Sequence, residues 1–244
     1  MNGPQLFLRY AFRPNLLGYC GGEDSRALLE YGLDGRVDGG LLEMERQFEG
    51  AYPYLELIAR ANRIADPLDR RVVEAYWIGN SLLDQVDMGA LHRSLEERFR
   101  DRSGAKGWAL LGTKAPDGAR PHHSFHVLEV FPRMGLMRSG AADHVLETME
   151  QCRIRWARVV SAQGAQLSVE ASPLRLREGK LELGEPRVET VLRWVDGSGF
   201  VDSAAPGGWV SVHWGWACDT LTPVQRGNLA AYTQRHLDLC NRTL

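Results

Sequence analysis

The chain of 244 residues is long enough for one large or two ordinary domains, and its 44% hydrophobic and 25% charged residues are typical of a globular protein. A net charge of -2 and a pI near 6.4 give no basic surface for nucleic acid, so we expect no nucleic-acid partner. No apolar run is long enough to cross a membrane and the N-terminus does not resemble a signal peptide, which predicts a cytoplasmic protein without membrane contact.

The first cysteine lies in a glycine-rich stretch. Gly18, Gly21 and Gly22 surround Cys20, and because glycines allow close backbone approach and expose a thiol, Cys20 is a candidate metal ligand. The alternative is a small apolar cysteine buried beneath a turn between two helices. The 4 cysteines form no CxxC pair, which predicts free thiols and argues against a zinc finger.

Helical spacing of apolar residues predicts that the first 150 residues form a mainly helical domain. We expect helices over 41–64 with an interruption at Gly50 and Pro53, from Asp66 to about 86, over 91–100 and over 139–151. Residues 101–121 are rich in turn-forming residues, so they predict a loop with at most one short strand, at 108–111.

The densest group of metal-binding side chains is formed by His122, His123 and His126. His122 and His126 fall on the same face of either a strand or a helical turn, so they can share a metal ion. Neutral imidazoles suit zinc, nickel and iron, and Cys20 or Glu74 are candidates for a further ligand. The other interpretation is that these histidines only make hydrogen bonds inside the core.

After residue 150 the pattern changes to short strands separated by turns, which predicts a small β-barrel. In the most regular strand, over 208–217, one face carries Val210, Val212, Trp214 and Trp216, and the other carries Ser211, His213 and Gly215. We expect the first set to enter the core and the second to present the His213 imidazole. Thr222, Pro223 and Gln225 then form a capping box that begins a helix reaching about Leu239.

This strand, with Gly-x-Trp-Val followed by Val-His-x-Gly-x-Ala, and the Leu-Thr-Pro-led helix after it resemble the end of the HypC/HupF-type chaperones of nickel-iron hydrogenase maturation. That family also begins with a functional cysteine, then a strand, a glycine turn and a second strand. Cys152, the segment 153–160, Gly164 and the segment 167–169 follow the same order. The resemblance covers about residues 150–239.

The resemblance implies a small OB-like barrel with a C-terminal helix, and a cysteine thiolate that holds an iron carrying cyanide and carbon monoxide. It assigns the thiolate to Cys152 and a supporting role to His213, either as a metal ligand or as a hydrogen-bond partner. It implies the hydrogenase large-subunit precursor or another maturation factor as the partner. A soft thiolate suits such an iron, and we expect Arg153 and Arg155 to favour the thiolate form of Cys152.

We therefore predict an α+β chain, with a mainly helical domain over 1–150 and a HypC-like barrel with its helix over 151–244, that acts as a maturation chaperone and not as an enzyme. Two other functions fit the sequence. One is a metalloenzyme that uses the histidine cluster of the first domain. The other is a metal-free interaction module that binds a partner through Trp209, Trp214 and Trp216.

Overall fold

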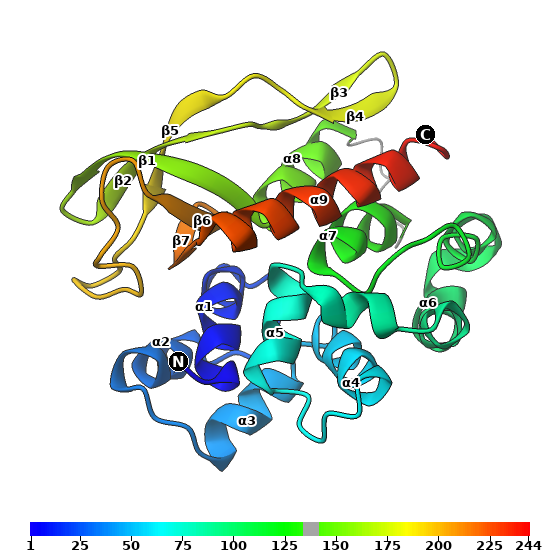
Figure 1. Ribbon diagram of the computed structural model, residues 1–244, viewed down its shortest axis with the longest axis horizontal. Coiled ribbons are helices and arrows are strands. Elements are labelled where there is room, and N and C mark those ends of the chain that lie inside the picture. The colour runs from blue at the N-terminus through cyan, green and yellow to red at the C-terminus, as the bar shows by residue number, and fades with distance from the viewer. Residues whose placement is uncertain (134–141) are drawn as a thin grey trace.

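The structure is a computed structural model that describes residues 1–133 and 142–244, and it confirms the α+β class (Figure 1). The first segment contains α1 (Gly3–Leu16), α2 (Ser25–Asp34), α3 (Gly39–Arg46), α4 (Tyr52–Ala61), α5 (Arg70–Trp77), the 3-10 turn η1 (Ser81–Gln85), α6 (Met88–Leu111), α7 (His123–Phe125), the π-helical turn η2 (His126–Val130), the 3-10 turn η3 (Phe131–Arg133) and α8 (Ala142–Cys152). The second contains β1 (Arg155–Gln163), β2 (Gln166–Ala171), β3 (Leu174–Arg177), β4 (Lys180–Leu183), β5 (Arg187–Leu192), β6 (Trp209–His213), β7 (Trp216–Thr220) and α9 (Pro223–Cys240).

The helix boundaries differ from the sequence prediction at several places. The helix expected to reach about residue 86 ends at Trp77, and the separate 3-10 turn η1 follows it. The helix expected from Asp66 begins at Arg70, because the Asp69 side chain, and not that of Asp66, accepts the hydrogen bond from the Arg71 amide (2.9 Å). The segment 101–121 is not a loop throughout, since α6 continues through a kink at Gly104 (φ 65°, ψ 175°).

Two further expectations concern helices in the first segment. The pattern over 41–64 forms the two helices α3 and α4, as its interruption predicts. The helix predicted over 139–151 corresponds to α8, and its first three expected positions lie outside the described residues.

The strands β1, β2, β5, β7 and β6 close into a barrel in that order, while β3 and β4 form a separate hairpin. All neighbouring pairs in the barrel are antiparallel except β5 and β7, which meet in parallel at Leu192 and Trp216. Small and β-branched side chains fill the barrel, among them Ala157, Val169 and Val212. The predicted barrel after residue 150 is therefore present.

The strand β6 is buried on both of its faces. Val210 and Val212 enter the barrel core as expected, but Ser211 and His213 are buried as well because α1 covers the other face. The expected alternation stops at Trp214, where the chain turns in the left-handed conformation (φ 52°), so Trp214 does not lie on one strand face with Trp216.

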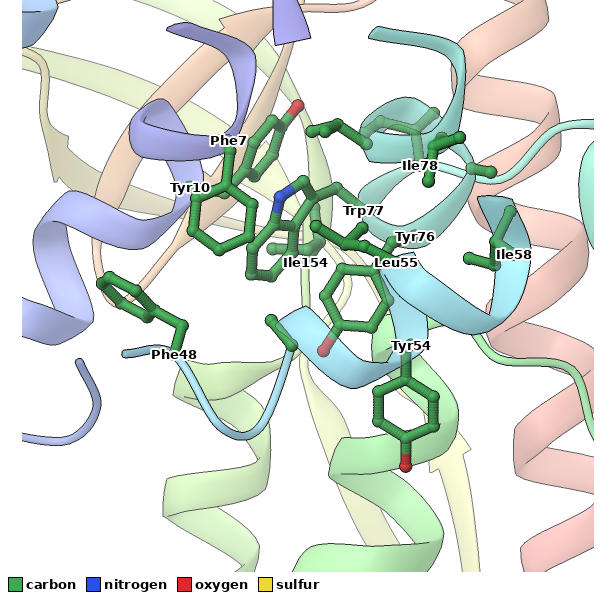
Figure 2. Close-up of a cluster of buried hydrophobic side chains, with 14 of the residues drawn as sticks. Phe7, Tyr10, Phe48, Tyr54, Leu55, Ile58, Tyr76, Trp77, Ile78 and Ile154 are labelled. Atoms are coloured by element: carbon green, nitrogen blue, oxygen red, sulfur yellow. The ribbon is translucent and has the colours of Figure 1, made fainter. Parts of the chain in front are cut away.

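One hydrophobic cluster extends from the helical segment onto the outside of the barrel. The largest buried cluster contains residues of α1, α4 and α5 together with Ile154, Trp216 and Leu229. Figure 2 shows Trp77 of α5 against Phe7 and Tyr10 of α1, with Ile154 close by. Residue 150 therefore marks a change of secondary structure, with this cluster on both sides of it and a second cluster inside the barrel.

The C-terminal helix α9 starts as predicted, with a capping box in which the Thr222 side chain accepts a hydrogen bond from the Gln225 amide (3.2 Å) and the Gln225 side chain accepts one from the Thr222 amide (3.0 Å). It packs on α7, η2, β1 and β4, so it ties the helical segment to the barrel (Figure 1). Among the described residues, the structure contains no helix with the length and hydropathy needed to span a membrane.

Candidate metal centre

Three potential metal ligands converge where three elements end or begin. His123 is the first residue of α7, Cys152 is the last of α8 and His213 is the last of β6. One ligand atom from each lies within 4.8 Å of the other two. The structure thus joins the cysteine and histidine assigned by the family resemblance to one histidine of the cluster that was expected to form a different site.

Local contacts place His123. The preceding residue, His122, caps α7 by accepting a hydrogen bond from the Ser124 amide (3.1 Å), which starts the short helix at His123. The chain then passes into the π-helical turn η2, a rare geometry that is frequent at functional sites. The His123 ring packs against Trp77 of α5, with ring centroids 4.7 Å apart.

An ion-pair group fixes the chain around Cys152. Arg153 donates to Glu150 (2.7 Å), and Arg155 donates to the other oxygen of the same carboxylate (3.1 Å). The expectation that both arginines favour the Cys152 thiolate is wrong, because Glu150 and Glu189 together compensate their charge and burial raises the pKa of Cys152 to about 12. The nearby Cys20 sulfur adds to this rise in pKa, and Trp214 opposes it.

The His213 ring is held from its far side. Its Nδ1 lies 2.8 Å from the Tyr10 carbonyl oxygen, and since a carbonyl only accepts, Nδ1 carries the proton. Nε2 is then a bare lone pair, and it is buried without a hydrogen-bond partner in the described part of the chain. An unsatisfied buried nitrogen is costly, so a lone pair held in this way is suited to a metal ion.

The tautomer of His123 can change if the Tyr76 hydroxyl rotates and Nε2 no longer donates to the Cys152 carbonyl. Its Nε2 lies 2.8 Å from the Cys152 carbonyl oxygen, which fixes the proton on Nε2 when no ligand is bound. Its Nδ1 lies 3.2 Å from the Tyr76 hydroxyl, which is also 3.2 Å from the Gly50 carbonyl oxygen. If the Tyr76 hydroxyl turns to Gly50, it accepts a hydrogen bond from Nδ1–H, and Nε2 can bind a metal once its lone pair turns away from the Cys152 carbonyl oxygen.

Burial keeps all three groups uncharged at neutral pH. It lowers the pKa of His123 to about 4 and the pKa of His213 well below its usual value, because a charged imidazolium is poorly solvated there. Both imidazoles are therefore in the form that binds metals. A bound cation would replace the proton of the Cys152 thiol and would compensate the negative charge of the thiolate.

The three ligands line a cavity of about 140 Å³. A single water needs roughly 15 Å³ on the same kind of measure, so the cavity has room for an ion and several small exogenous ligands. Its other walls are mainly apolar, with Phe48, Tyr76, Trp77, Phe131 and Trp214 among them. Such walls exclude water and strengthen the electrostatic interactions of a bound ion.

The donor set fits a soft or borderline metal ion. One thiolate and two imidazoles suit zinc, copper, iron or nickel better than magnesium or calcium. A tetrahedral ion with bonds of about 2.0–2.3 Å needs its ligand atoms about 3.5 Å apart, so the three groups have to approach by about 1 Å. The thiol of Cys152 and Nε2 of His123 are already 3.9 Å apart.

The remaining predicted ligands are placed differently. His122 points away from the cavity, where it stacks on Tyr232 and hydrogen-bonds to Ser124 (2.8 Å), so the expected sharing of a metal by His122 and His126 is wrong. His126 lines the cavity and faces Tyr54, with Nδ1 at 3.4 Å from its hydroxyl. Cys20 is exposed and also lines the cavity.

The three tryptophans that were expected to bind a partner differ in exposure. Trp216 is completely buried against Phe12 and Phe200, which leaves it no surface for a partner. Trp214 is buried at the cavity and stacks on Tyr19, with ring centroids 3.8 Å apart. Trp209 is half-buried beneath the Arg226 guanidinium.

Comparisons with known proteins add a family and no function. The chain matches, over residues 1–244, the family described as "Family of unknown function (DUF6390)". No curated protein and no solved structure matches it.

Proposed function

Because the chain belongs to the DUF6390 family, which has no assigned function, we propose its function from the site: it is a cytoplasmic accessory protein that holds a transition-metal cargo on Cys152, His123 and His213. The observation that carries this proposal is the approach of the three ligand atoms to within 4.8 Å of one another. The buried lone pair of His213 supports it, since the nitrogen has no other partner in the described residues.

The chemistry of the pocket favours metal binding over nucleophilic catalysis. A catalytic cysteine needs a lowered pKa and a histidine that accepts its proton. Here burial raises the pKa of Cys152 to about 12, and His123 directs an N–H at the Cys152 carbonyl. Metal binding needs only neutral imidazoles and a thiol that can lose its proton to the bound cation.

The family resemblance supports a specific cargo. In the HypC/HupF-type chaperones the corresponding cysteine holds an iron with cyanide and carbon monoxide, and Cys152 and His213 are the residues that match. We propose the same role here, in nickel-iron hydrogenase maturation, with the hydrogenase large-subunit precursor or another maturation factor as the partner. A cavity of about 140 Å³ with mainly apolar walls suits an ion with diatomic ligands.

Infrared spectroscopy tests the cargo. The protein is purified without oxygen from a hydrogenase-producing host, and its cyanide and carbonyl stretching bands and its metal content are measured beside Cys152→Ala and the matched variant Cys240→Ala, whose thiol lies elsewhere in the core. We expect bands in the wild type and in Cys240→Ala and none in Cys152→Ala. Stoichiometric metal without these bands would restrict the proposal to a plain metal site, and metal that survives Cys152→Ala would refute it.

A further inference from the structure

A second thiol lies at the exposed end of the metal cavity. Cys20 is exposed and Cys152 is half-buried, yet both line the same cavity. In sequence the two are far apart, and only the packing of the loop after α1 onto the end of α8 and β6 brings them to one space. The cavity therefore connects an exposed cysteine with a half-buried one.

The loop that carries Cys20 is held in place. The Asn15 side chain donates a hydrogen bond to the Cys20 carbonyl (2.8 Å), and the Tyr19 amide donates to the Pro14 carbonyl (2.9 Å). Gly18 and Gly21 take left-handed conformations (φ 75° and 81°) that other residues rarely adopt. These contacts hold Cys20 at the cavity.

The inner end of the cavity offers the ligand that a captured metal would need next. His213 is only 2% exposed, and its Nε2 lone pair has no partner in the parts of the chain that the structure describes. Tyr19, beside Cys20, stacks on Trp214, beside His213. This stacking holds the chain at Cys20 beside the chain at His213, and both residues line the same cavity.

We propose that Cys20 is a capture ligand, which binds a thiophilic metal cargo at the surface and passes it to Cys152 inside. The proposal rests on the function proposed above. On capture the Cys20 thiol loses its proton to solvent and a bond from sulfur to metal forms. On transfer that bond breaks as the bond to the Cys152 sulfur forms, and the Cys152 proton moves to the Cys20 sulfur. No atom changes its oxidation state.

Ligand exchange between thiolates explains why this route is useful. Cys152 is half-buried behind the mainly apolar walls of the cavity, so a metal held by another protein has little direct access to its sulfur. An exposed thiol meets the donor first, and the exchange to the enclosed site then needs no free ion. The expected cargo is accordingly a soft or borderline metal centre with at least one exchangeable ligand.

Rapid mixing of the full-length protein with Cd²⁺ alone, without oxygen, tests the capture and the transfer. The measured quantity is the sulfur-to-cadmium charge-transfer absorbance over time. We expect a fast phase and a slow phase in the wild type and in Cys240→Ala. Cys20→Ser loses the fast phase but reaches a final absorbance that still includes the Cys152 sulfur, and Cys152→Ser keeps the fast phase but loses the slow one.

The outcomes separate this proposal from the one on which it rests. If Cys20→Ser loads at the wild-type rate while Cys152→Ser loses its slow phase, Cys20 is not a capture ligand although the inner site stands. If Cys152→Ser and His213→Ala bind Cd²⁺ as the wild type does, the inner site itself is refuted. Thermal unfolding monitored by circular dichroism establishes that each variant is folded before its kinetics are compared.

Discussion

Replacing Tyr76 by phenylalanine removes the one hydroxyl that faces Nδ1 of His123. In the metal-free protein this hydroxyl donates to Nδ1, and when Nε2 binds a metal it has to accept from Nδ1 instead, with its own proton turned to the Gly50 carbonyl. In Tyr76→Phe the Nδ1 proton has no acceptor, so the metal-binding tautomer of His123 loses its support.

The Tyr76→Phe variant is expected to lose metal affinity, because a metal-bound histidine binds best when its other ring nitrogen has a hydrogen-bond partner. Removing a hydrogen-bond partner of a metal-bound histidine costs about 10- to 100-fold in metal affinity, or about 1.4–2.7 kcal/mol. The ring of Tyr76 still fills its place in the core between Tyr54 and Trp77, with centroids 5.7 and 4.7 Å away. We therefore expect a weaker metal site in a protein that folds normally.

Competition for Zn²⁺ or Co²⁺ against a chelator of known affinity measures this loss. The matched control is Tyr54→Phe, which removes a buried hydroxyl from the same aromatic cluster. This hydroxyl faces His126, which is not one of the three proposed ligands. Equal affinity of Tyr76→Phe and the wild type would refute the tautomer argument. So would an equal loss in both variants, since that indicates a general effect of the aromatic cluster.

Three further predictions concern stability. Burial raises the pKa of Glu45 to about 9, above its unfolded value, so its contribution to stability is fully present below about pH 4.5 and is lost as the pH rises toward 9. The free energy of unfolding in urea is expected to fall between pH 5 and 8 by on the order of 3 kcal/mol more in the wild type than in Glu45→Gln. Parallel pH profiles of the two proteins would contradict this. Glu129→Leu leaves the completely buried Lys114 without its carboxylate (3.2 Å) and is expected to cost about 3–5 kcal/mol by chemical denaturation, whereas a loss below about 1 kcal/mol would show that the pair contributes little. Thr222→Ala removes the cap of α9 and is expected to cost about 1 kcal/mol in the same assay, with an unchanged midpoint as the opposing result.

Local signals in the sequence were sufficient for much of the fold. Short strands with turns predicted a barrel, and the capping box at Thr222 predicted the start of α9. The prediction failed where the packing overrides a local pattern. Gly104 is compatible with a loop by itself, yet it lies at a kink inside α6 because Leu111, further along, is buried in the core.

The candidate site was predictable only in parts. The resemblance selected Cys152 and His213, and the density of histidines selected the segment that contains His123. Spacing favoured His122 with His126, but His122 is used as a helix cap and His123 reaches the cavity. No periodicity or motif indicates that residues from two distant segments meet, because this depends on the packing of the helical segment on the barrel.

The surrounding residues give even less sequence signal. Tyr76 belongs to an apolar stripe that is typical of any buried helix, and its contact with Nδ1 of His123 arises from the way α5 meets α7. Trp214 was expected in a strand core, and its place at the cavity follows from the left-handed turn after β6. Side chains that surround a metal site, such as Tyr76 and Trp214, are of the same residue types as those in any hydrophobic core, so the sequence does not distinguish them.

The most direct test of the account is the absorption spectrum of the Co²⁺-loaded protein, recorded without oxygen for the wild type, Cys152→Ser, His213→Ala and, as a matched histidine control, His126→Ala at the same cavity. The account predicts one bound Co²⁺ with a sulfur-to-cobalt charge-transfer band in the wild type and in His126→Ala. It predicts no such band in Cys152→Ser and a weakened site in His213→Ala. Unchanged spectra in these two variants, or a wild type that binds no Co²⁺, would contradict the existence of a metal site formed by His123, Cys152 and His213.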